Sequence, residues 1–235
     1  MSRLLHFTIF MLFALTSFSQ LKFSDAEILL HNQLVWRGQR LGTGISIEPS
    51  ATVTSGRFSF NAWAAFTADN SYTELDLVPS YQFDLFSLSL LDYYIPVSEQ
   101  SNKFLNFKEG QSRHSLELTI DNYSIEKQRF KWMVGTFFAG DRDSITNNSL
   151  YSTYLEFKYP FTVLGIDVEP VVGLTPFRGL YADNFAFVNT GISLSKELQL
   201  SSRFSIPLAI SFIHNPYLNV QTFVVSCGIS FSGSE

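Results

Sequence analysis

Apolar and polar residues alternate along most of this chain, and this pattern restricts the chain to strands with two different faces. In residues 58–67 every even position holds phenylalanine or alanine, whereas Ser59, Asn61 and Thr67 are among the odd positions. A period of two is typical of a half-buried strand, whereas an amphipathic helix has a period of about 3.6 residues. The sequence therefore predicts an all-β protein.

Twelve segments follow this pattern, and each is long enough to cross a membrane at a tilt, which takes ~9–11 residues. An even number of strands returns both chain ends to one side, as in bacterial single-chain barrels. We therefore predict an up-and-down antiparallel transmembrane β-barrel, formed as a single domain by residues 20–235. The expected strands are residues 26–37, 43–54, 56–67, 72–84, 86–95, 112–123, 129–139, 149–159, 162–174, 184–196, 201–213 and 218–231.

The links between these segments alternate in length, which supports a membrane barrel. Outer-membrane barrels have short periplasmic turns and longer outside loops. The alternation of residues slips at Leu90 and Leu91, where a bulge or a strand end beyond the membrane would explain the change. The short links are 55, 85, 124–128, 160–161 and 197–200, and the mostly longer links are 38–42, 68–71, 96–111, 140–148, 175–183 and 214–217.

The polar faces of the strands carry charges in mid-strand, mixed with Ser, Thr and Gly. This composition fits a crowded polar lumen and favours a membrane barrel over a secreted soluble barrel. Arg37 is the residue of most interest. We expect it to form ion pairs with Glu48, Glu74 or Asp76, because a charge inside a barrel must be paired or hydrated. The alternative is that Arg37 recognises a substrate directly. The predicted lumen charge network comprises Arg37, Glu48, Glu74, Asp76, Glu117, Asp121, Lys131, Glu156, Lys158, Asp167 and Glu169.

Aromatic residues near the expected strand ends suggest the girdles that lie at the two membrane interfaces. The alternative is that an aromatic-rich β protein scatters such residues without any such role. The candidate girdle residues are Trp36, Phe66, Tyr72, Tyr93, Tyr94, Tyr151, Tyr159, Phe161, Tyr181 and Tyr217.

The first nineteen residues have the features of an export signal. Arg3 precedes a short apolar core at residues 4–15, and Ser17 and Ser19 fit the small-residue positions of a signal-peptidase site. We therefore predict a signal peptide at 1–19. Near the other end, residues 228–231 resemble the strand-terminal signal that is recognised by the barrel-assembly machinery, although four residues follow them. The expected partners are this machinery, outer-membrane lipid and small solutes.

Charge and cysteine content exclude several other functions. A net charge of −5 gives no basic face for nucleic acid. The single cysteine, Cys227, rules out an internal disulfide and a zinc–thiolate cluster. Asp141 and Asp143 offer too few oxygens for calcium, which takes six to eight ligands. No cofactor or metal is predicted.

No catalytic residues are predicted either. A hydrolase needs a nucleophile and a base within hydrogen-bond reach of each other. The histidines after the signal are His31, His114 and His214, and the neighbours His114 and Ser115 point to opposite faces of a strand. An acyl-hydrolase barrel is therefore the least favoured function.

Several short motifs resemble the Gcw_chp family of bacterial outer-membrane barrels, a conserved hypothetical family. They are Val35-Trp36-Arg37-Gly38, Trp63, Glu74-x-Asp76 with Tyr81, and Tyr93-Tyr94-Ile95-Pro96, with a fainter match at Tyr154-Leu155-Glu156 and Tyr159-Pro160. The resemblance implies an outer-membrane location and an unsettled role, with a porin as one option. It transfers no catalytic residues.

Three functions remain open at this stage. The barrel is a porin-like channel for small solutes or cations, a plugged structural or binding barrel that acts through its outside loops, or, least favoured, a hydrolase. Strand number does not decide between the first two, because eight strands are filled by side chains and about sixteen leave a channel. Acidic residues outnumber basic ones on the expected lumen face, which predicts a preference for cations.

Overall fold

The computed structural model describes residues 21–97, 102–108 and 111–233. The expected signal peptide at 1–19 lies outside these ranges. Within them, no helix is long and apolar enough to cross a membrane. The strands of the described ranges are β1 (Lys22–His31), β2 (Leu34–Trp36), β3 (Gln39–Leu41), β4 (Ser46–Ser55), β5 (Phe58–Thr67), β6 (Thr73–Gln82), β7 (Ser87–Tyr94), β8 (His114–Asp121), β9 (Lys131–Ala139), β10 (Thr153–Lys158), β11 (Phe161–Val163), β12 (Ile166–Thr175), β13 (Ala186–Gln199), β14 (Phe204–Asn215) and β15 (Val220–Ser232).

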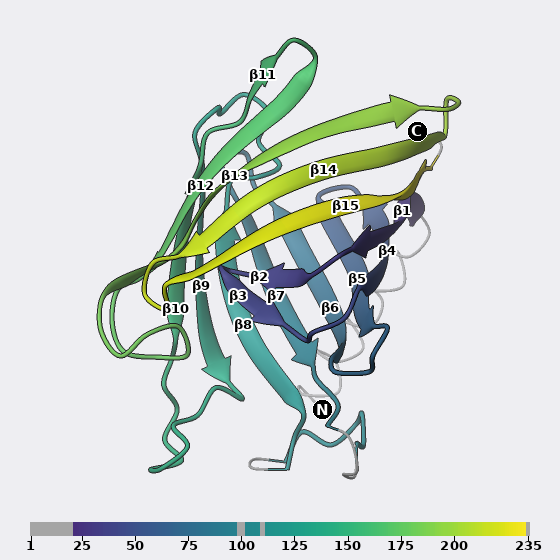
Figure 1. The fold of residues 1–235 in the computed structure, drawn as a ribbon. Coiled ribbons are helices and arrows are strands. Elements are labelled where there is room, and N and C mark those ends of the chain that lie inside the picture. The colour runs from purple at the N-terminus through teal and green to yellow at the C-terminus, as the bar shows by residue number, and fades with distance from the viewer. Residues whose placement is uncertain (1–20, 98–101, 109–110, 234–235) are drawn as a thin grey trace, which may run out of the picture.

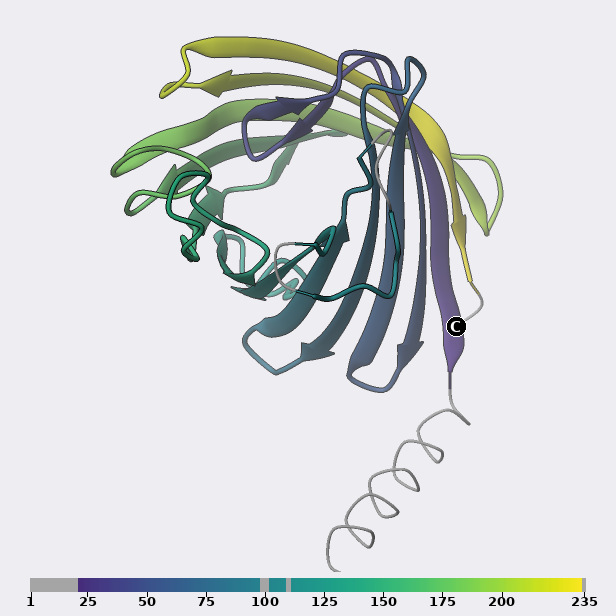
Figure 2. The ribbon, with the colours of Figure 1, turned by 90° about the horizontal axis from the view of Figure 1, so that it is seen from below.

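The strands close into a barrel in which each strand pairs antiparallel with its neighbours (Figures 1 and 2). The order is β1-β4-β5-β6-β7-β8-β9-β10-β12-β13-β14-β15, and β15 pairs with β1 to close the ring. β10 and β11 both pair with β12 and form one barrel strand, interrupted at Tyr159 and Pro160. The prediction of a closed up-and-down barrel of twelve strands is confirmed.

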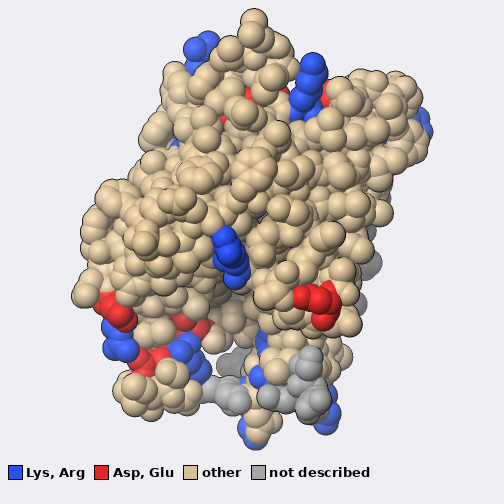
Figure 3. Space-filling view, viewed as in Figure 1, with Lys and Arg blue, Asp and Glu red and all other residues tan. Residues whose placement is uncertain are grey.

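The outer surface of the barrel is apolar, as the alternation of residues predicts. Ile28, Phe66, Leu118 and Phe212 all point outward and are between 44% and 48% exposed. Figure 3 shows few charged side chains across the middle of the visible face and most of them near the two ends. Large apolar surface in contact with water is unfavourable at ~25 cal/mol per Å². A surface of this kind is therefore suited to lipid.

The two ends of the barrel differ in the length of their connections. Short turns at 56–57, 83–86 and 200–203 lie at one end, called here the short-turn end. Longer connections at 32–45, 95–113 and 140–152 lie at the other, the long-loop end, which is at the bottom of Figure 1. Most strand limits agree with the expected ones to within a few residues, and the first strand is the main exception.

The expected strand 26–37 ends at His31, and the chain then turns into the barrel. β2 and β3 form a hairpin, residues 34–41, that pairs only with itself and lies inside the ring of strands (Figure 2). Arg37 and Gly38 have φ values of 50° and 79°, as a two-residue type I′ turn requires. A Cβ atom on Gly38 would overlap the carbonyl oxygen of Val188, so only glycine fits.

The slip at Leu90 and Leu91 has a different cause from the expected bulge. The pairing of β7 with β8 runs from Ser87 to Tyr94 without a register shift. Leu91 points inward and packs against buried aromatic residues, whereas Asp92 points outward and binds His114 at 2.7 Å. The alternation changes here because the inner face of the barrel is locally apolar.

The two faces of β10 provide a direct test of this architecture. Phe157 stacks on Phe130 on the outer face, with ring centroids 5.7 Å apart, whereas Lys158 Nζ lies 3.1 Å from Glu169 Oε1 on the inner face. We expect Phe157→Arg to cost about 2–4 kcal/mol at midplane depth and less near an interface, and Lys158→Ala to cost less than that. Folding efficiency in lipid vesicles measures both, with Phe157→Leu as the control. Folding of Phe157→Arg as efficient as wild type would contradict the face assignment.

Candidate functional site

The 34–41 hairpin crosses the lumen and is held at its far side by an ion pair. At its tip, Arg37 donates from both terminal nitrogens to Glu117 on β8, with distances of 2.6 and 2.8 Å. β8 is five positions from β1 in the ring, so the contact joins nearly opposite walls. Arg40 also donates to Thr222 on β15 at 2.7 Å. These contacts make the hairpin a partition inside the barrel.

The ion pair is enclosed by aromatic side chains. The guanidinium of Arg37 lies 4.6 Å from the ring centroid of Trp36 and 4.7 Å from that of Tyr154, which are distances for cation–π contact. Arg37 also donates to the hydroxyl of Tyr181, and Tyr93 donates to Glu117 at 2.6 Å. The Arg37 and Glu117 side chains are 7% and 0% exposed, so each depends on these partners.

A glycine on the next strand makes room for this carboxylate. A Cβ atom on Gly135 of β9 would overlap Oε1 of Glu117. Any other residue at this position would displace the carboxylate that holds the hairpin.

A second group of polar side chains adjoins the first through Tyr154. Glu156 accepts hydrogen bonds from Tyr154 at 2.5 Å and from Tyr123 at 2.7 Å. Lys158 lies 3.4 Å from Glu156 and bridges it to Glu169 on β12. Tyr154 therefore joins the two groups: its ring contacts Arg37, and its hydroxyl donates to the carboxylate of Glu156.

Closely packed side chains fill the lumen around these groups. A cluster of buried residues from β7, β9, β10, β13 and the 176–185 connection fills this side, with Trp36 of the hairpin packed against it. It includes two edge-to-face or tilted contacts of Trp36, with Tyr93 at 5.9 Å and Tyr181 at 5.7 Å. The cluster consists of Tyr93, Met133, Phe137, Tyr154, Tyr181, Ala182 and Val188.

The opposite wall, formed by β4, β5 and β6, is acidic. Glu74 stands across from the fully buried Ala65, and the pairing of Ile47 with Phe66 puts Glu48 on the other side of the same alanine. Glu48 and Glu74 are therefore about 10 Å apart at the backbone, two strand spacings. Together with Asp76 they form what we call the acidic wall: Glu48, Glu74 and Asp76, each less than 9% exposed.

The hydrogen bonds of the acidic wall are incomplete. Glu48 accepts from Ser46 at 2.6 Å and lies 2.8 Å from Nδ1 of His31. Glu74 accepts from the hydroxyl of Tyr72 at 2.9 Å. In the described part of the chain, Oδ1 of Asp76 is buried with no hydrogen-bond partner. A buried acceptor without a partner is costly, about 1–3 kcal/mol.

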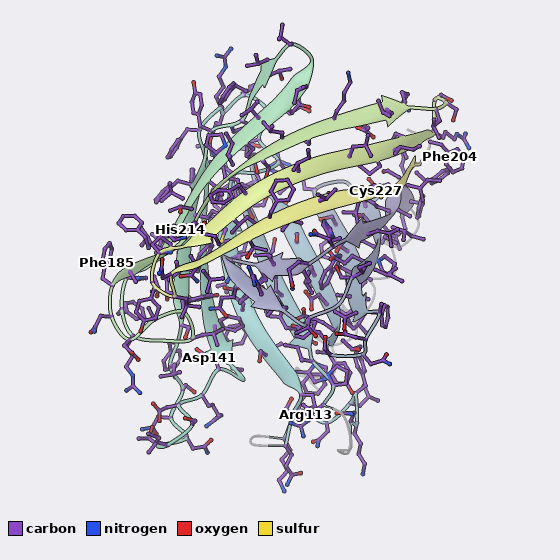
Figure 4. All side chains as sticks on the ribbon, viewed as in Figure 1. Arg113, Asp141, Phe185, Phe204, His214 and Cys227 are labelled. Atoms are coloured by element: carbon purple, nitrogen blue, oxygen red, sulfur yellow. The ribbon has the colours of Figure 1, made fainter. Side chains whose placement is uncertain are left out.

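A cavity of about 350 Å³ lies at the long-loop end, between the hairpin and the wall formed by β6, β7, β8 and β9. Figure 4 shows Asp141 beyond the end of β9, and Asp141 is among the residues that line this cavity. We call it the vestibule; its lining includes Trp36, Gln39 and Leu41 of the hairpin, Tyr72, Glu74, Tyr93 and Phe137 of the wall, and Asp141, Arg142 and Leu180 of the loops.

Three other charged residues predicted for the lumen form their hydrogen bonds near the short-turn end. Asp121 accepts from the backbone N–H of Tyr123 at 3.0 Å, and Lys131 donates to the carbonyl oxygen of Ile125 at 2.7 Å. Asp167 accepts from Thr162 at 2.7 Å. Each of these contacts stays within its own turn or hairpin, away from Arg37.

The expected partners of Arg37 were wrong. Arg37 lies on the inward hairpin instead of on a barrel strand, and it binds Glu117 instead of Glu48, Glu74 or Asp76. The reason is the turn at residues 37–38, which carries the guanidinium away from the β4 wall toward β8.

The prediction of an aromatic girdle was also wrong for four of its members. Trp36, Tyr93 and Tyr181 lie in the packed lumen, and Tyr72 directs its hydroxyl to Glu74. Sequence reasoning missed Tyr123, Tyr154 and Asn189, which bind Glu156. The inward position of Tyr154, two residues before Glu156 on one face of a strand, was the available signal.

The loops at the mouth do not form a metal site. Among the described residues, no group of three or more His, Cys, Asp or Glu side chains is arranged to hold a metal ion. Asp143 instead accepts from the backbone N–H groups of Thr146 and Ile145 and binds Arg178 at 2.5 Å. These bonds, the backbone ones first, hold the pKa of the Asp143 carboxyl below its usual range. This carboxylate therefore links the 140–152 and 176–185 connections.

Among the residues that the structure describes, no histidine is placed to activate a hydroxyl. Nε2 of His114 lies 2.5 Å from the carbonyl oxygen of Phe104, and its Nδ1 faces Asp92. His31 contacts Glu48, and His214 lies at the end of β14, 3.3 Å from the carbonyl oxygen of Val220.

No family model matches the chain, and no curated protein matches its sequence. Solved porin structures are similar in fold. The KdgM porin is 10% identical over 88% of this chain and 98% of its own, with a TM-score of 0.51. The NanC porin is 6% identical over 88% of this chain and 99% of its own, also with a TM-score of 0.51. The chain therefore has the barrel fold of outer-membrane porins.

The pairing of Arg37 with Glu117 makes a quantitative prediction. Arg37→Ala would leave a buried carboxylate without its cation, so we expect the free energy of unfolding to fall by about 3–5 kcal/mol. Arg57→Ala is the control, because Arg57 pairs with Asp84 at the surface, with side chains 55% and 80% exposed. It should change stability by less than about 1 kcal/mol. Urea unfolding in lipid vesicles measures both, and equal losses would contradict a stabilising role for the buried pair.

Proposed function

We propose that this protein is a bacterial outer-membrane channel for small solutes, with a preference for cations, whose lumen is narrowed by the 34–41 hairpin. The observation that carries this proposal is the division of the lumen. The hairpin and the aromatic cluster fill the lumen beside β9, β10 and β13, whereas the acidic wall lies on β4 and β6, and the vestibule lies between the hairpin and β6 to β9. A confined path lined by carboxylates favours cations.

Several features support an outer-membrane location. The apolar outer surface is suited to lipid, and the long and short connections are sorted to opposite ends as in outer-membrane barrels. Residues 1–19 have the features of an export signal, and the short motifs that resemble those of the Gcw_chp family are consistent with the same location. Outer-membrane lipid and the barrel-assembly machinery are the partners that this location requires.

Between the acidic wall and the short-turn end, small polar side chains lie on the inner faces of β4 to β7. Ser80 and Ser89 face each other on the inner sides of β6 and β7 and are hydrogen-bonded at 2.7 Å. Thr54 and Ser59 occupy the same level on β4 and β5. These side chains leave more room than the aromatic cluster opposite, so the solute path runs along β4 to β7.

A plugged barrel that acts through its loops is the second candidate. The observation in its favour is the bidentate contact of Arg37 with Glu117, which holds the hairpin across the lumen. A hydrolase is less favoured still, because Nε2 of His114 faces a carbonyl oxygen instead of a hydroxyl.

Surface labelling tests location and orientation. In a Cys227→Ser background, Asn102→Cys should react with an impermeant thiol reagent on whole cells, because Asn102 lies in the long 95–113 connection. Glu126→Cys, in the 122–130 connection at the short-turn end, should react only after the outer membrane is opened. The reverse pattern would invert the orientation, and no labelling at either site on intact or opened cells would contradict the location.

Electrophysiology tests the channel and its selectivity. In planar bilayers the purified barrel should conduct, and its reversal potential in a KCl gradient should show cation preference. Asp76→Asn should reduce that preference, because Asp76 belongs to the acidic wall. Asp84→Asn removes the same charge from an exposed turn and should leave the preference unchanged.

Removal of the partition is the complementary test. Replacing residues 34–41 by a short Gly-Ser link should raise single-channel conductance several-fold, because the hairpin crosses the lumen. Anion preference would contradict the role of the acidic wall, and a barrel that stays silent with and without the hairpin would favour the plugged alternative.

A further inference from the structure

We infer that the outer surface over β12 to β15 carries a binding site for an anionic phospholipid, in which Lys196 binds the phosphate and an apolar groove receives an acyl chain. This inference rests on the outer-membrane location in the proposed function and names a partner of the barrel wall. It combines three observations: a groove on the surface that faces lipid, a lysine in its lining, and the lack of an acidic partner for that lysine in the described part of the chain.

The groove, about 400 Å³ in volume, crosses the outward faces of β13, β14 and β15. It lies between two rows of side chains that the register aligns across these strands, and small residues between the rows face the lumen, so the backbone forms its floor. One row consists of Leu194, Ile210 and Val225, the other of Lys196, Leu208 and Cys227, the residues between them are Ser195, Ala209 and Ser226, and Ile166 of β12 completes the lining. Apart from the lysine, the two rows are uncharged, which suits the groove to a hydrocarbon chain.

Lys196 is the exception on this apolar surface. It is exposed and lies between Leu194 and Leu198, which are each 41% exposed on the same face of β13. A charged side chain on a surface that faces lipid is unfavourable unless it reaches an interface or binds an opposite charge. The neighbouring acid, Glu197, points to the lumen and accepts a hydrogen bond from Ser205. Among the described residues no carboxylate forms an ion pair with Lys196, so the groove contains one positive charge without a counter-charge.

Lys196 lies close to the level of the lipid headgroups. β13 continues beyond it only to Gln199, and the 200–203 turn of the short-turn end follows. This part of the strand spans about 10 Å, and a strand tilt of ~35–45° reduces it to roughly 7–8 Å along the barrel axis. The flexible stem of a lysine can extend along apolar surface and carry its ammonium group most of this way. The ammonium group of Lys196 therefore reaches the level at which lipid phosphates lie.

The charge pattern favours an anionic lipid over a zwitterionic one. A phosphate supplies both the negative charge and the acceptor oxygens that an ammonium group, with three donors, requires. A zwitterionic headgroup brings a cation of its own, which leaves the charge of Lys196 uncompensated. Arg203, in the adjacent turn, adds a second exposed cation at this end. In the proposed orientation the short-turn end faces the periplasm, so the lipid belongs to the periplasmic leaflet.

Fluorescence quenching in lipid vesicles tests this inference. Cys227, labelled in Figure 4, is the single cysteine of the chain and lines the groove, two strand spacings or about 10 Å from Lys196. The purified barrel carries a bimane label on Cys227 and is folded into phosphatidylcholine vesicles that contain a minor share of phosphatidylglycerol. In one preparation the acyl chains of phosphatidylglycerol are brominated, and in the other those of an equal share of phosphatidylcholine.

Bromine quenches the label at short range, so quenching reports which lipid occupies the groove. We expect phosphatidylglycerol to bind there about fivefold better than phosphatidylcholine, which is the contribution of one lysine to the binding of anionic lipid.

Two variants locate the preference at Lys196. Lys196→Gln should remove the preference for phosphatidylglycerol, and Lys196→Arg should keep it. Arg57→Gln removes the same charge from an exposed turn at the same end of the barrel, so it is the matched control and should keep the preference. Heat-modifiable migration on gels identifies variants that fold, and the comparison of the two lipids in the wild-type protein needs no variant.

The outcomes separate this inference from the channel itself. Equal quenching by the two lipids, or an equal loss of preference in Lys196→Gln and Arg57→Gln, would overturn the lipid site. Weak quenching by both lipids would also overturn it, because the groove would then be covered by a second copy of the chain instead of lipid. Since quenching needs no ion flow, a barrel that is silent in planar bilayers but prefers phosphatidylglycerol would overturn the channel and support the site. A barrel that conducts cations but shows no lipid preference would do the opposite.

Discussion

The ion pair between Arg37 and Glu117 is the interaction on which the interior of this barrel depends. Both side chains are almost fully buried, so each needs the other. The backbone of Arg37 is left-handed, a conformation that costs about 1–2 kcal/mol for a residue with a Cβ. The cation–π and hydrogen-bond contacts of the guanidinium offset this cost. Gly38 and Gly135 provide the space at the two ends of the pair.

The hairpin makes the lumen asymmetric, and this asymmetry decides what the interior can do. On one side, aromatic residues from the wall pack on Trp36 as in the core of a soluble protein. On β4 and β6, the carboxylates of the acidic wall remain, and Glu74 lines a cavity that the hairpin and the aromatic cluster also border. Twelve strands enclose a lumen of intermediate width, and the inserted hairpin occupies part of it.

The outward faces of the strands could be predicted from sequence because lipid imposes one simple rule, an apolar residue at every second position. The interior follows no such rule. The hairpin was not predicted for two reasons. The alternation of apolar and polar residues in β1 continues through Trp36, so the sequence shows no strand end at His31. The turn residues Arg37 and Gly38 also lack the Asn or Asp that is usual at the first position of such a turn. The partner of Arg37 is eighty residues away on a strand that only closure brings near. Leu91 and Asp92 broke the expected pattern for the same reason, because the packed cluster and His114 determine which way each points.

The way the hairpin is attached also determines how the interior can change. β2 and β3 pair only with each other, so no backbone ladder joins them to the barrel wall. Side-chain contacts of Arg37 and Arg40, and the hydrogen bond from Asn215 to the carbonyl oxygen of Gly38, hold the hairpin in place. The barrel itself is closed by continuous pairing around the ring, and it loses none of that pairing when the hairpin moves. Displacement of the hairpin therefore costs only its own contacts, and the width of the lumen is governed by one buried ion pair and its aromatic enclosure.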